Sequence, residues 1–158
     1  KRQDMERFII IFLLSFSLSA SNKLDLNQIY NIIKHVETNN KATKIGDGGK
    51  AYGIVQIHKI CVQDINRIYN TEFTHKQAFS ETYSREMFML YIQAGIKRFK
   101  KKYCRSPTEY EIVRMWNGGI YNGYKKTSTL QYLKRYILYK IKLSNFKKMC
   151  RFDSYTST

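Results

Sequence analysis

The sequence predicts a single, mainly α-helical domain that contains at most a small β-hairpin. Its 158 residues fit one domain of ordinary size. The composition is 43% hydrophobic and 15% aromatic and includes only one proline, which favours a packed helical core over disorder. Apolar residues recur at helical spacing in several segments, whereas only one short segment is β-prone. The elements follow in chain order.

The N-terminal segment has the pattern of an export signal. Eleven largely apolar residues, 8–18, follow a charged start and lead into small residues at 19–21. The apolar run is shorter than the roughly 20 residues that a membrane-spanning helix needs. We therefore expect a signal peptide over residues 1–20, with residues 1–4 as an upstream extension. The mature protein is expected to be periplasmic, or extracellular and associated with the cell wall.

The first helix of the mature chain is predicted to begin after Asp25, which has the position of an N-cap. From Leu26 onward, apolar residues lie at helical spacing on one face, and that stripe ends on Glu37. Asparagines and the glycine-rich run 46–49 then predict a loop of about a dozen residues. Residues 51–58 (AYGIVQIH) are β-prone and bounded by glycines, which predicts either a strand of a hairpin or a tight turn.

The rest of the chain is predicted to be helical. Apolar spacing indicates helices over residues 62–69 and 87–99. Ser106 is predicted to cap a further helix, with Glu109 completing a capping box, and Asn-Gly-Gly at 117–119 to end it. The last helix is expected over residues 127–143. Its predicted core face consists of Leu130, Leu133, Ile137 and Ile141.

The chain carries a large positive charge. Lys and Arg outnumber Asp and Glu by 28 to 12, which gives a formal net charge of +16. No acidic residue occurs between Glu111 and Asp153, so the C-terminal third should attract anionic wall polymers or a membrane surface. No zinc-finger, helix-turn-helix or RNA-binding signature accompanies this charge, and we expect no nucleic-acid partner. We divide the mature chain into a domain over residues 21–143 and a basic tail over 144–158, and expect a monomer.

The cysteines give little guidance. Cys61, Cys104 and Cys150 are an odd number and form no Cys-x-x-Cys pair, so they indicate neither a metal site nor a disulfide framework. One disulfide remains open, for example between Cys61 and Cys104. We expect no metal and no cofactor.

Glu37 is the first candidate catalytic residue. A carboxyl group that extends an apolar helical stripe loses contact with water, which raises its pKa. Cleavage of a sugar acetal near neutral pH needs such an acid to protonate the leaving oxygen. From the helical pattern alone, the alternative is a last-turn residue that faces solvent.

Asp47 is a second candidate. It follows Glu37 by ten residues in a glycine-rich loop, where backbone N–H groups could stabilise its charge. A second carboxylate would suit hydrolysis through an activated water. The alternative is an ordinary turn residue, since Asp-Gly is a frequent turn pair.

Several aromatic and amide side chains complete the candidate site. Flat apolar faces and amide groups together form a mixture that binds sugar rings. The aromatic candidates are Tyr52, Trp116, Tyr121 and Tyr124, and the amide candidates are Gln56, Asn117 and Asn122. Individually, each residue is also compatible with a place in the core or in a turn.

With these residues in place, the chain resembles the lytic transglycosylase and goose-type lysozyme superfamily over residues 26–138. The first matching motif is the helix that ends on the catalytic Glu, here IIKHVETNN, with Thr38 in a position often held by Ser. The second is the Gly-x-x-Gln-Ile turn within AYGIVQI, residues 51–57. The third is the helix-ending Asn-Gly-Gly within MWNGG, residues 115–119, where Trp116 takes the place of the more frequent Tyr.

The resemblance implies a lysozyme-like α+β fold with a two-sided saccharide cleft. It assigns Glu37 as acid and then base. Its implied substrate-binding residues are Thr38, Tyr52, Gly53, Gln56, Ile57, Trp116, Asn117, Gly118 and, from a later helix, Tyr132, with Tyr136 as the reserve candidate for that last place.

The implied reaction is cleavage of the β-1,4 bond between N-acetylmuramic acid and N-acetylglucosamine in peptidoglycan. It gives 1,6-anhydro products without a cofactor. Two alternatives remain: a lysozyme that uses Asp47 to position water, and a wall-binding secretion-assembly protein with little turnover.

Overall fold

Helix α2, Leu26–Thr38, opens the part of the chain that the computed structural model describes, residues 24–153. Asp25 caps it as predicted, because its carboxylate accepts hydrogen bonds from the backbone N–H groups of Asn27, at 2.9 Å, and Gln28, at 3.1 Å. The helix ends at Asn39, whose φ of 51° is left-handed. The predicted signal peptide lies outside the described residues.

A small sheet follows α2. Its strands are β1 (Ile45–Gly46), β2 (Ala51–Tyr52) and β3 (Ile57–His58), which pair antiparallel in the order β1-β2-β3. The segment 51–58 therefore contains both of the structures left open by the sequence, two strands and a tight turn between them. The sheet has one short strand more than a hairpin. The prediction of a mainly α-helical fold with little β structure is confirmed.

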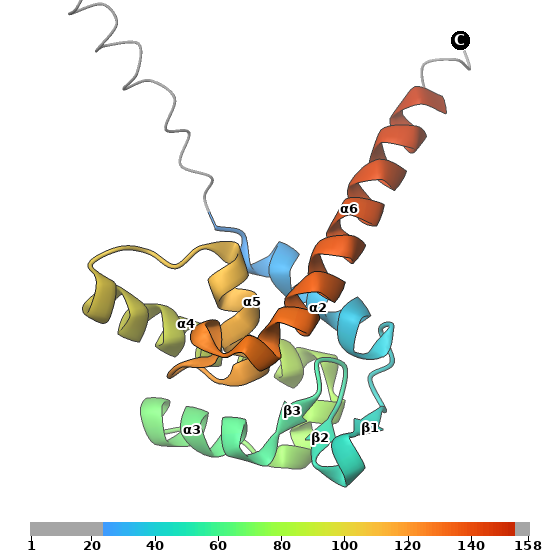
Figure 1. The fold of residues 1–158 in the computed structure, drawn as a ribbon. Helices are drawn as coiled ribbons and strands as arrows, with labels where there is room; N and C mark the ends of the chain where they lie inside the picture. The colour runs from blue at the N-terminus through green and yellow to red at the C-terminus, as the bar shows by residue number, and fades with distance from the viewer. Residues whose placement is uncertain (1–23, 154–158) are drawn as a thin grey trace, which may run out of the picture.

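The remaining helices enclose one core. They are α3 (Lys59–Tyr69), α4 (Glu81–Tyr103), α5 (Glu109–Gly118) and α6 (Leu130–Asp153). Helix α4 contacts α2, α3 and α5, and also the short 3-10 segment that precedes α4 in the chain, His75–Phe79. Figure 1 shows α3 and the sheet in the lower part of the molecule and α2, α5 and the start of α6 above them. Phe88 and Ile92 of α4, both fully buried, lie in this core.

Helix α5 starts differently from the prediction. Its cap is Thr108 rather than Ser106, and Glu111 rather than Glu109 completes the capping box. Arg105 holds Glu111 with two hydrogen bonds of 2.9 and 2.7 Å, which favours this later start. Glu109 is then free to accept a hydrogen bond from the Tyr136 hydroxyl at 2.7 Å, which links α5 to α6.

The predicted core face of α6 is wrong in part. Leu130 and Ile141 are exposed, at 48% and 52%, whereas Tyr132 and Tyr136 are buried. The helix packs against both α2 and α5, and these two tyrosines fill the contact. Helix α6 also runs without a break across residue 143, where the sequence placed the boundary between domain and tail. Its C-terminal half projects away from the rest of the molecule (Figure 1).

Two further findings concern the described residues. None of their helices is long and apolar enough to cross a membrane. Cys61 is buried and Cys104 is exposed, and both thiols are free, so the pairing considered from the sequence does not form.

Candidate functional site

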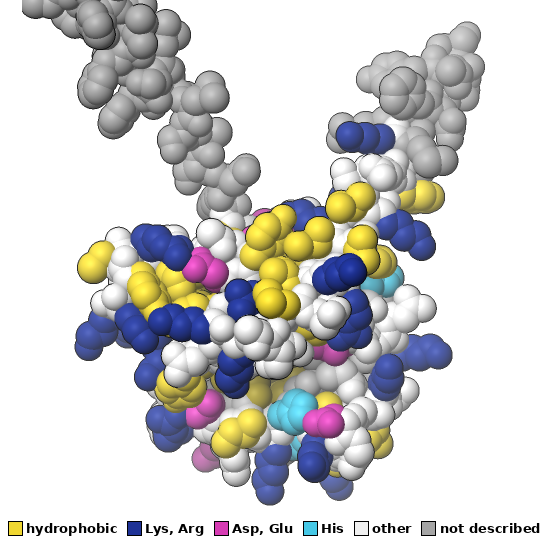
Figure 2. Space-filling view, in the orientation of Figure 1, with side chains coloured by type: hydrophobic (Ala, Val, Ile, Leu, Met, Phe, Trp, Pro, Cys, Tyr) yellow, Lys and Arg dark blue, Asp and Glu magenta, His cyan; other side chains and the backbone are white. Residues whose placement is uncertain are grey.

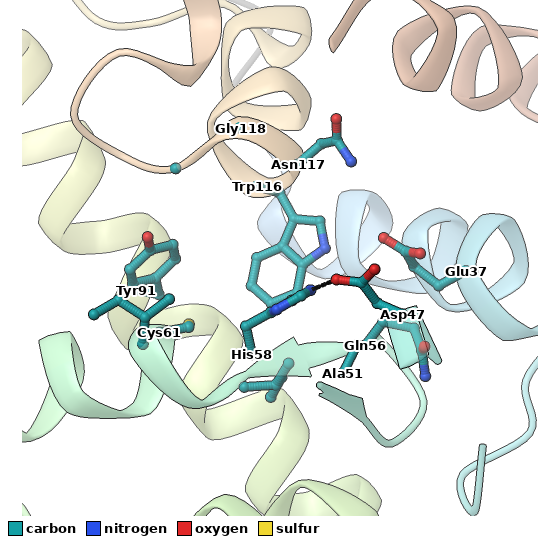
Figure 3. A pocket seen from close by; sticks show the side chains of 13 residues that line it. Glu37, Asp47, Ala51, Gln56, His58, Cys61, Tyr91, Trp116, Asn117 and Gly118 are labelled. Atoms are coloured by element: carbon teal, nitrogen blue, oxygen red, sulfur yellow. Dashed lines mark ion pairs between the residues drawn. The ribbon is translucent and has the colours of Figure 1, made fainter. Parts of the chain in front are cut away.

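An open pocket of about 450 Å³ lies where the end of α2, the sheet and the end of α5 meet. Glu37, Asp47, Gln56 and Ile57 line it from the α2 and sheet side, and Trp116, Asn117 and Gly118 line it from α5. Figure 3 shows these two groups of side chains on opposite sides of the pocket. The structure thus brings together seven of the predicted site residues from three separate segments of the chain.

Glu37 is the next-to-last residue of α2, and its half-buried side chain reaches this pocket. Burial raises the pKa of its carboxyl group above the ordinary value. The Tyr132 hydroxyl, the Arg135 charge and the Trp116 indole offset part of this rise. The result is a carboxyl group that keeps its proton to higher pH than an exposed Glu and can donate it to a bound molecule.

Tyr132 is a buried neighbour of Glu37. Its side chain is only 3% exposed and lines neither this pocket nor its neighbour. Its hydroxyl makes no hydrogen bond of regular geometry, yet it lies close enough to lower the pKa of Glu37. Conversely, burial and the Glu37 charge raise the pKa of Tyr132. Tyr132 is therefore placed to adjust the pKa of the Glu37 carboxyl group.

Asp47 lies at the rim of the pocket. It starts a short 3-10 turn, Asp47–Gly49, with a left-handed φ of 48°, and its side chain is 64% exposed. One carboxylate oxygen lies 3.5 Å from Nε2 of His58, which is also on the pocket wall (Figure 3). This contact places the second carboxylate on the pocket that Glu37 also lines.

The Gly-x-x-Gln-Ile turn shapes the sheet side of the pocket. Gly53 has a φ of +79°, and a Cβ atom there would come within 1.7 Å of the backbone oxygen of Ala78, so only glycine fits. The Gln56 amide donates hydrogen bonds to the backbone oxygens of Gly53, at 2.8 Å, and Lys44, at 3.2 Å. Gln56 thus lines the pocket and also ties the turn to the preceding loop.

Three other residues predicted to bind substrate do not line the pocket. Thr38 is 4% exposed, donates a hydrogen bond to the backbone oxygen of Ile54 at 2.8 Å and lines a neighbouring cavity. Tyr52 stacks on His75 with ring centres 3.9 Å apart, and both line a separate cavity. Gly53 is buried in the turn. Thr38 links the hairpin to α2, and Tyr52 and Gly53 pack the hairpin against the segment before α4.

The α5 wall is closely packed. The half-buried Trp116 packs on Phe88 with ring centres 4.9 Å apart and meets Tyr91 edge-on. A Cβ atom at Gly118 would come within 2.6 Å of Thr129 and 2.7 Å of Gly123, so a larger residue does not fit at this position. Asn117 is exposed and also lines the pocket; Figure 3 shows it next to Trp116 at the end of α5.

The sequence reasoning missed His58, Cys61 and Tyr91, which also line the pocket. His58 directly follows the Gln-Ile motif, so its place on strand β3 was a usable signal. Cys61 and Tyr91 come from two different helices, and no spacing relates them to the motifs. Burial raises the pKa of the Cys61 thiol, so this thiol belongs to the pocket floor rather than to a nucleophile.

Within residues 24–153, no three His, Cys, Asp or Glu side chains gather in a position to hold a metal ion. No protein-family model matches the chain, and no curated protein matches it with significant similarity. The chemistry of the pocket therefore carries the functional proposal.

Proposed function

We propose that the protein is an exported peptidoglycan-cleaving glycosidase of the lytic transglycosylase kind. The observation that carries the proposal is Glu37, a half-buried carboxyl group with a raised pKa at the end of α2. Glu37 lines a pocket that is also lined by Trp116 and by the amide residues Gln56 and Asn117. The order of the three motifs along the chain supports the same proposal.

In the first step, protonated Glu37 donates its proton to the β-1,4 glycosidic oxygen between N-acetylmuramic acid and N-acetylglucosamine. The bond from that oxygen to the anomeric carbon breaks, and the substrate's own N-acetyl group assists at that carbon. Glu37 then accepts the proton of the 6-hydroxyl group of N-acetylmuramic acid while that oxygen attacks the same carbon. The product is a 1,6-anhydro sugar, and Glu37 ends the cycle protonated.

A hydrolase is the second candidate, and the position of Asp47 favours it. The carboxylates of Asp47 and Glu37 line one pocket, so Asp47 could orient a water molecule for attack at the anomeric carbon. The products would then be reducing sugars. We expect Asp47→Asn to spare a transglycosylase and to cripple a hydrolase. Reducing products from an unimpaired Asp47→Asn enzyme would exclude this role of Asp47.

The test is digestion of purified peptidoglycan by the wild type, Glu37→Gln and a control, Glu72→Gln, with mass spectrometry of the released fragments. Glu72 is exposed and lines none of the described pockets near Glu37. We expect Glu37→Gln to lose at least about 100-fold in rate, the usual contribution of a general acid, and Glu72→Gln to match the wild type. Equal rates for wild type and Glu37→Gln would remove Glu37 from the mechanism. Anhydro termini would identify the transglycosylase.

A wall-binding protein with little turnover gives a different result in the same experiment. The wild type would then sediment with peptidoglycan but release no fragments, and Glu37→Gln would bind equally well. If the wild type releases fragments and Glu37→Gln does not, this alternative is excluded.

A further inference from the structure

Glu37 lies between two cavities. One is the pocket described above, and the other, of about 610 Å³, opens on the other side of the end of α2. The second cavity is lined by the last turn of α2, by the loop over residues 41–44 and by Arg135 of α6. Glu37 lines both cavities, so a polymer whose scissile bond meets Glu37 has room on either side of it.

The two cavities differ in charge. The first is lined by the carboxylates of Glu37 and Asp47 and by no Lys or Arg. The second is lined by Lys41, Lys44 and Arg135, and its only acidic lining residue is Glu37 itself. A molecule that spans Glu37 would therefore meet aromatic and amide groups on one side and cations on the other.

These cations are available to a ligand. All three side chains are exposed, and none forms an ion pair with an acidic side chain of residues 24–148. Lys44 donates a hydrogen bond from Nζ to the backbone oxygen of Glu37 at 3.3 Å, which holds it at the end of α2. The Arg135 guanidinium lies over the Tyr132 ring, 5.2 Å from its centre, which orients it at the cavity.

We propose that the second cavity is an anion subsite that takes the carboxylates carried by N-acetylmuramic acid. The inference rests on the proposed function. N-acetylglucosamine is uncharged, whereas each N-acetylmuramic acid bears a lactyl group whose carboxyl is either free or linked to a peptide that carries further carboxylates. Cations on one side of Glu37 therefore distinguish the two sugars and fix the direction in which the strand crosses the acid.

Occupation of the subsite would also act on Glu37. Arg135 and Lys44 lower the pKa of its carboxyl group in the free protein. A bound carboxylate offsets these charges, so the Glu37 pKa rises when the substrate is in place and the acid keeps its proton at higher pH. The alkaline limb of the kcat profile should then lie at higher pH than that of the kcat/KM profile, because only the former reports the complex.

The experiment measures binding of glycan strands to Glu37→Gln protein, which does not consume them. The test variants add Lys44→Gln, Arg135→Gln or both, and the matched control adds Lys100→Gln, an equal charge change at an exposed position of α4 that lines neither cavity. The ligands are strands with free carboxylates and the same strands after amidation. Affinities are measured by isothermal titration calorimetry.

We expect each single change to weaken binding of the carboxylate strands about threefold and the double change about tenfold, as for exposed ion pairs. Amidated strands should bind all variants with the same affinity, and Lys100→Gln should not change the affinity for either ligand. The subsite would be overturned if the Lys44 and Arg135 variants bound carboxylate strands as tightly as the parent Glu37→Gln protein. It would also be overturned if these variants lost as much affinity for amidated strands as for carboxylate strands. If wild-type protein neither binds nor cleaves peptidoglycan, the proposed function fails. If it cleaves and the double change has no effect, the subsite alone fails.

Discussion

The buried hydroxyl group of Tyr132 and the half-buried carboxyl group of Glu37 lie against each other without a hydrogen bond of regular geometry. Each changes the ionisation of the other, since the hydroxyl lowers the pKa of Glu37 and the Glu37 charge raises that of Tyr132. Burial alone would raise the pKa of Glu37 further. The nearby hydroxyl moderates this rise, which favours the proton donation and return that the proposed reaction asks of Glu37.

The substitution Tyr132→Phe removes this moderating contact. We expect the alkaline limb of the kcat/KM profile to move to higher pH, because the pKa of Glu37 rises when the hydroxyl is lost. The free energy of unfolding should change by less than about 1 kcal/mol, because the buried hydroxyl has no regular partner to leave unpaired. The checks are a pH–rate profile and a urea titration. A limb that moves to lower pH would contradict this account.

Glu37 itself should make stability depend on pH. Its pKa is raised in the folded protein above the ordinary value of 4.5, so the folded state binds the proton more tightly than the unfolded state does. The stability that this provides is complete below the unfolded pKa and is lost as the pH rises through the folded pKa. We therefore expect Glu37→Gln to match the wild type in Tm below the ordinary pKa of 4.5, to exceed it increasingly as the pH rises above that value, and to keep a constant advantage above the folded pKa. A Tm difference that is constant with pH would rule out this burial effect.

The sequence predicted helices with regular apolar spacing and clear end signals. Asp25 followed by the stripe to Glu37 identified α2 and its orientation, because a cap and a helical face are local features. Helix α6 was harder to predict, because its buried face consists of Tyr132 and Tyr136, while Leu130 and Ile141 are exposed. Aliphatic spacing alone does not show that the neighbours α2 and α5 select the tyrosine face.

The candidate site was predictable where a residue lies within a motif and also faces the open side of the fold. Glu37, Gln56 and Trp116 meet both conditions. Thr38 and Tyr52 belong to the motifs but are used to hold the hairpin, and no sequence pattern separates these two roles. The cation at Arg135 reaches the site from a helix about a hundred residues later in the chain, so it follows only from the packing of α6 on α2.

Glycine positions around the hairpin offer a matched test of the fold. Gly53 and Gly49 both have positive φ, of 79° and 90°. A Cβ atom at Gly53 would meet the Ala78 backbone at 1.7 Å, whereas at Gly49 it would meet nothing within 4 Å. We expect Gly49→Ala to cost roughly 1–2 kcal/mol through backbone strain alone. Gly53→Ala should cost at least about 3 kcal/mol, because backbone must also move. Equal losses in urea titrations would show that the turn relaxes freely.

The projecting half of α6 should bind anionic surfaces in a salt-dependent manner. Figure 2 shows basic and hydrophobic side chains interspersed along this helix, and exposed residues of both kinds include Leu138, Ile141, Phe146, Lys142, Lys147 and Lys148. Exposed charges are screened over about 10 Å at 0.1 M salt. Sedimentation with purified walls and with anionic lipid vesicles should therefore fall steeply as salt is raised.

A matched pair of triple variants separates this helix from the net charge of the chain. The test variant replaces Lys142, Lys147 and Lys148 with Gln, and the control replaces Lys97, Lys100 and Lys101 of α4, which are also exposed. Each lysine near an anionic lipid surface contributes about 1 kcal/mol. The α6 variant should therefore lose more than tenfold in vesicle binding at low salt. The control variant keeps the α6 lysines and should lose far less, because attraction falls off within a Debye length of the surface. Equal losses in the two variants would mean that overall charge, and not α6, carries the attraction.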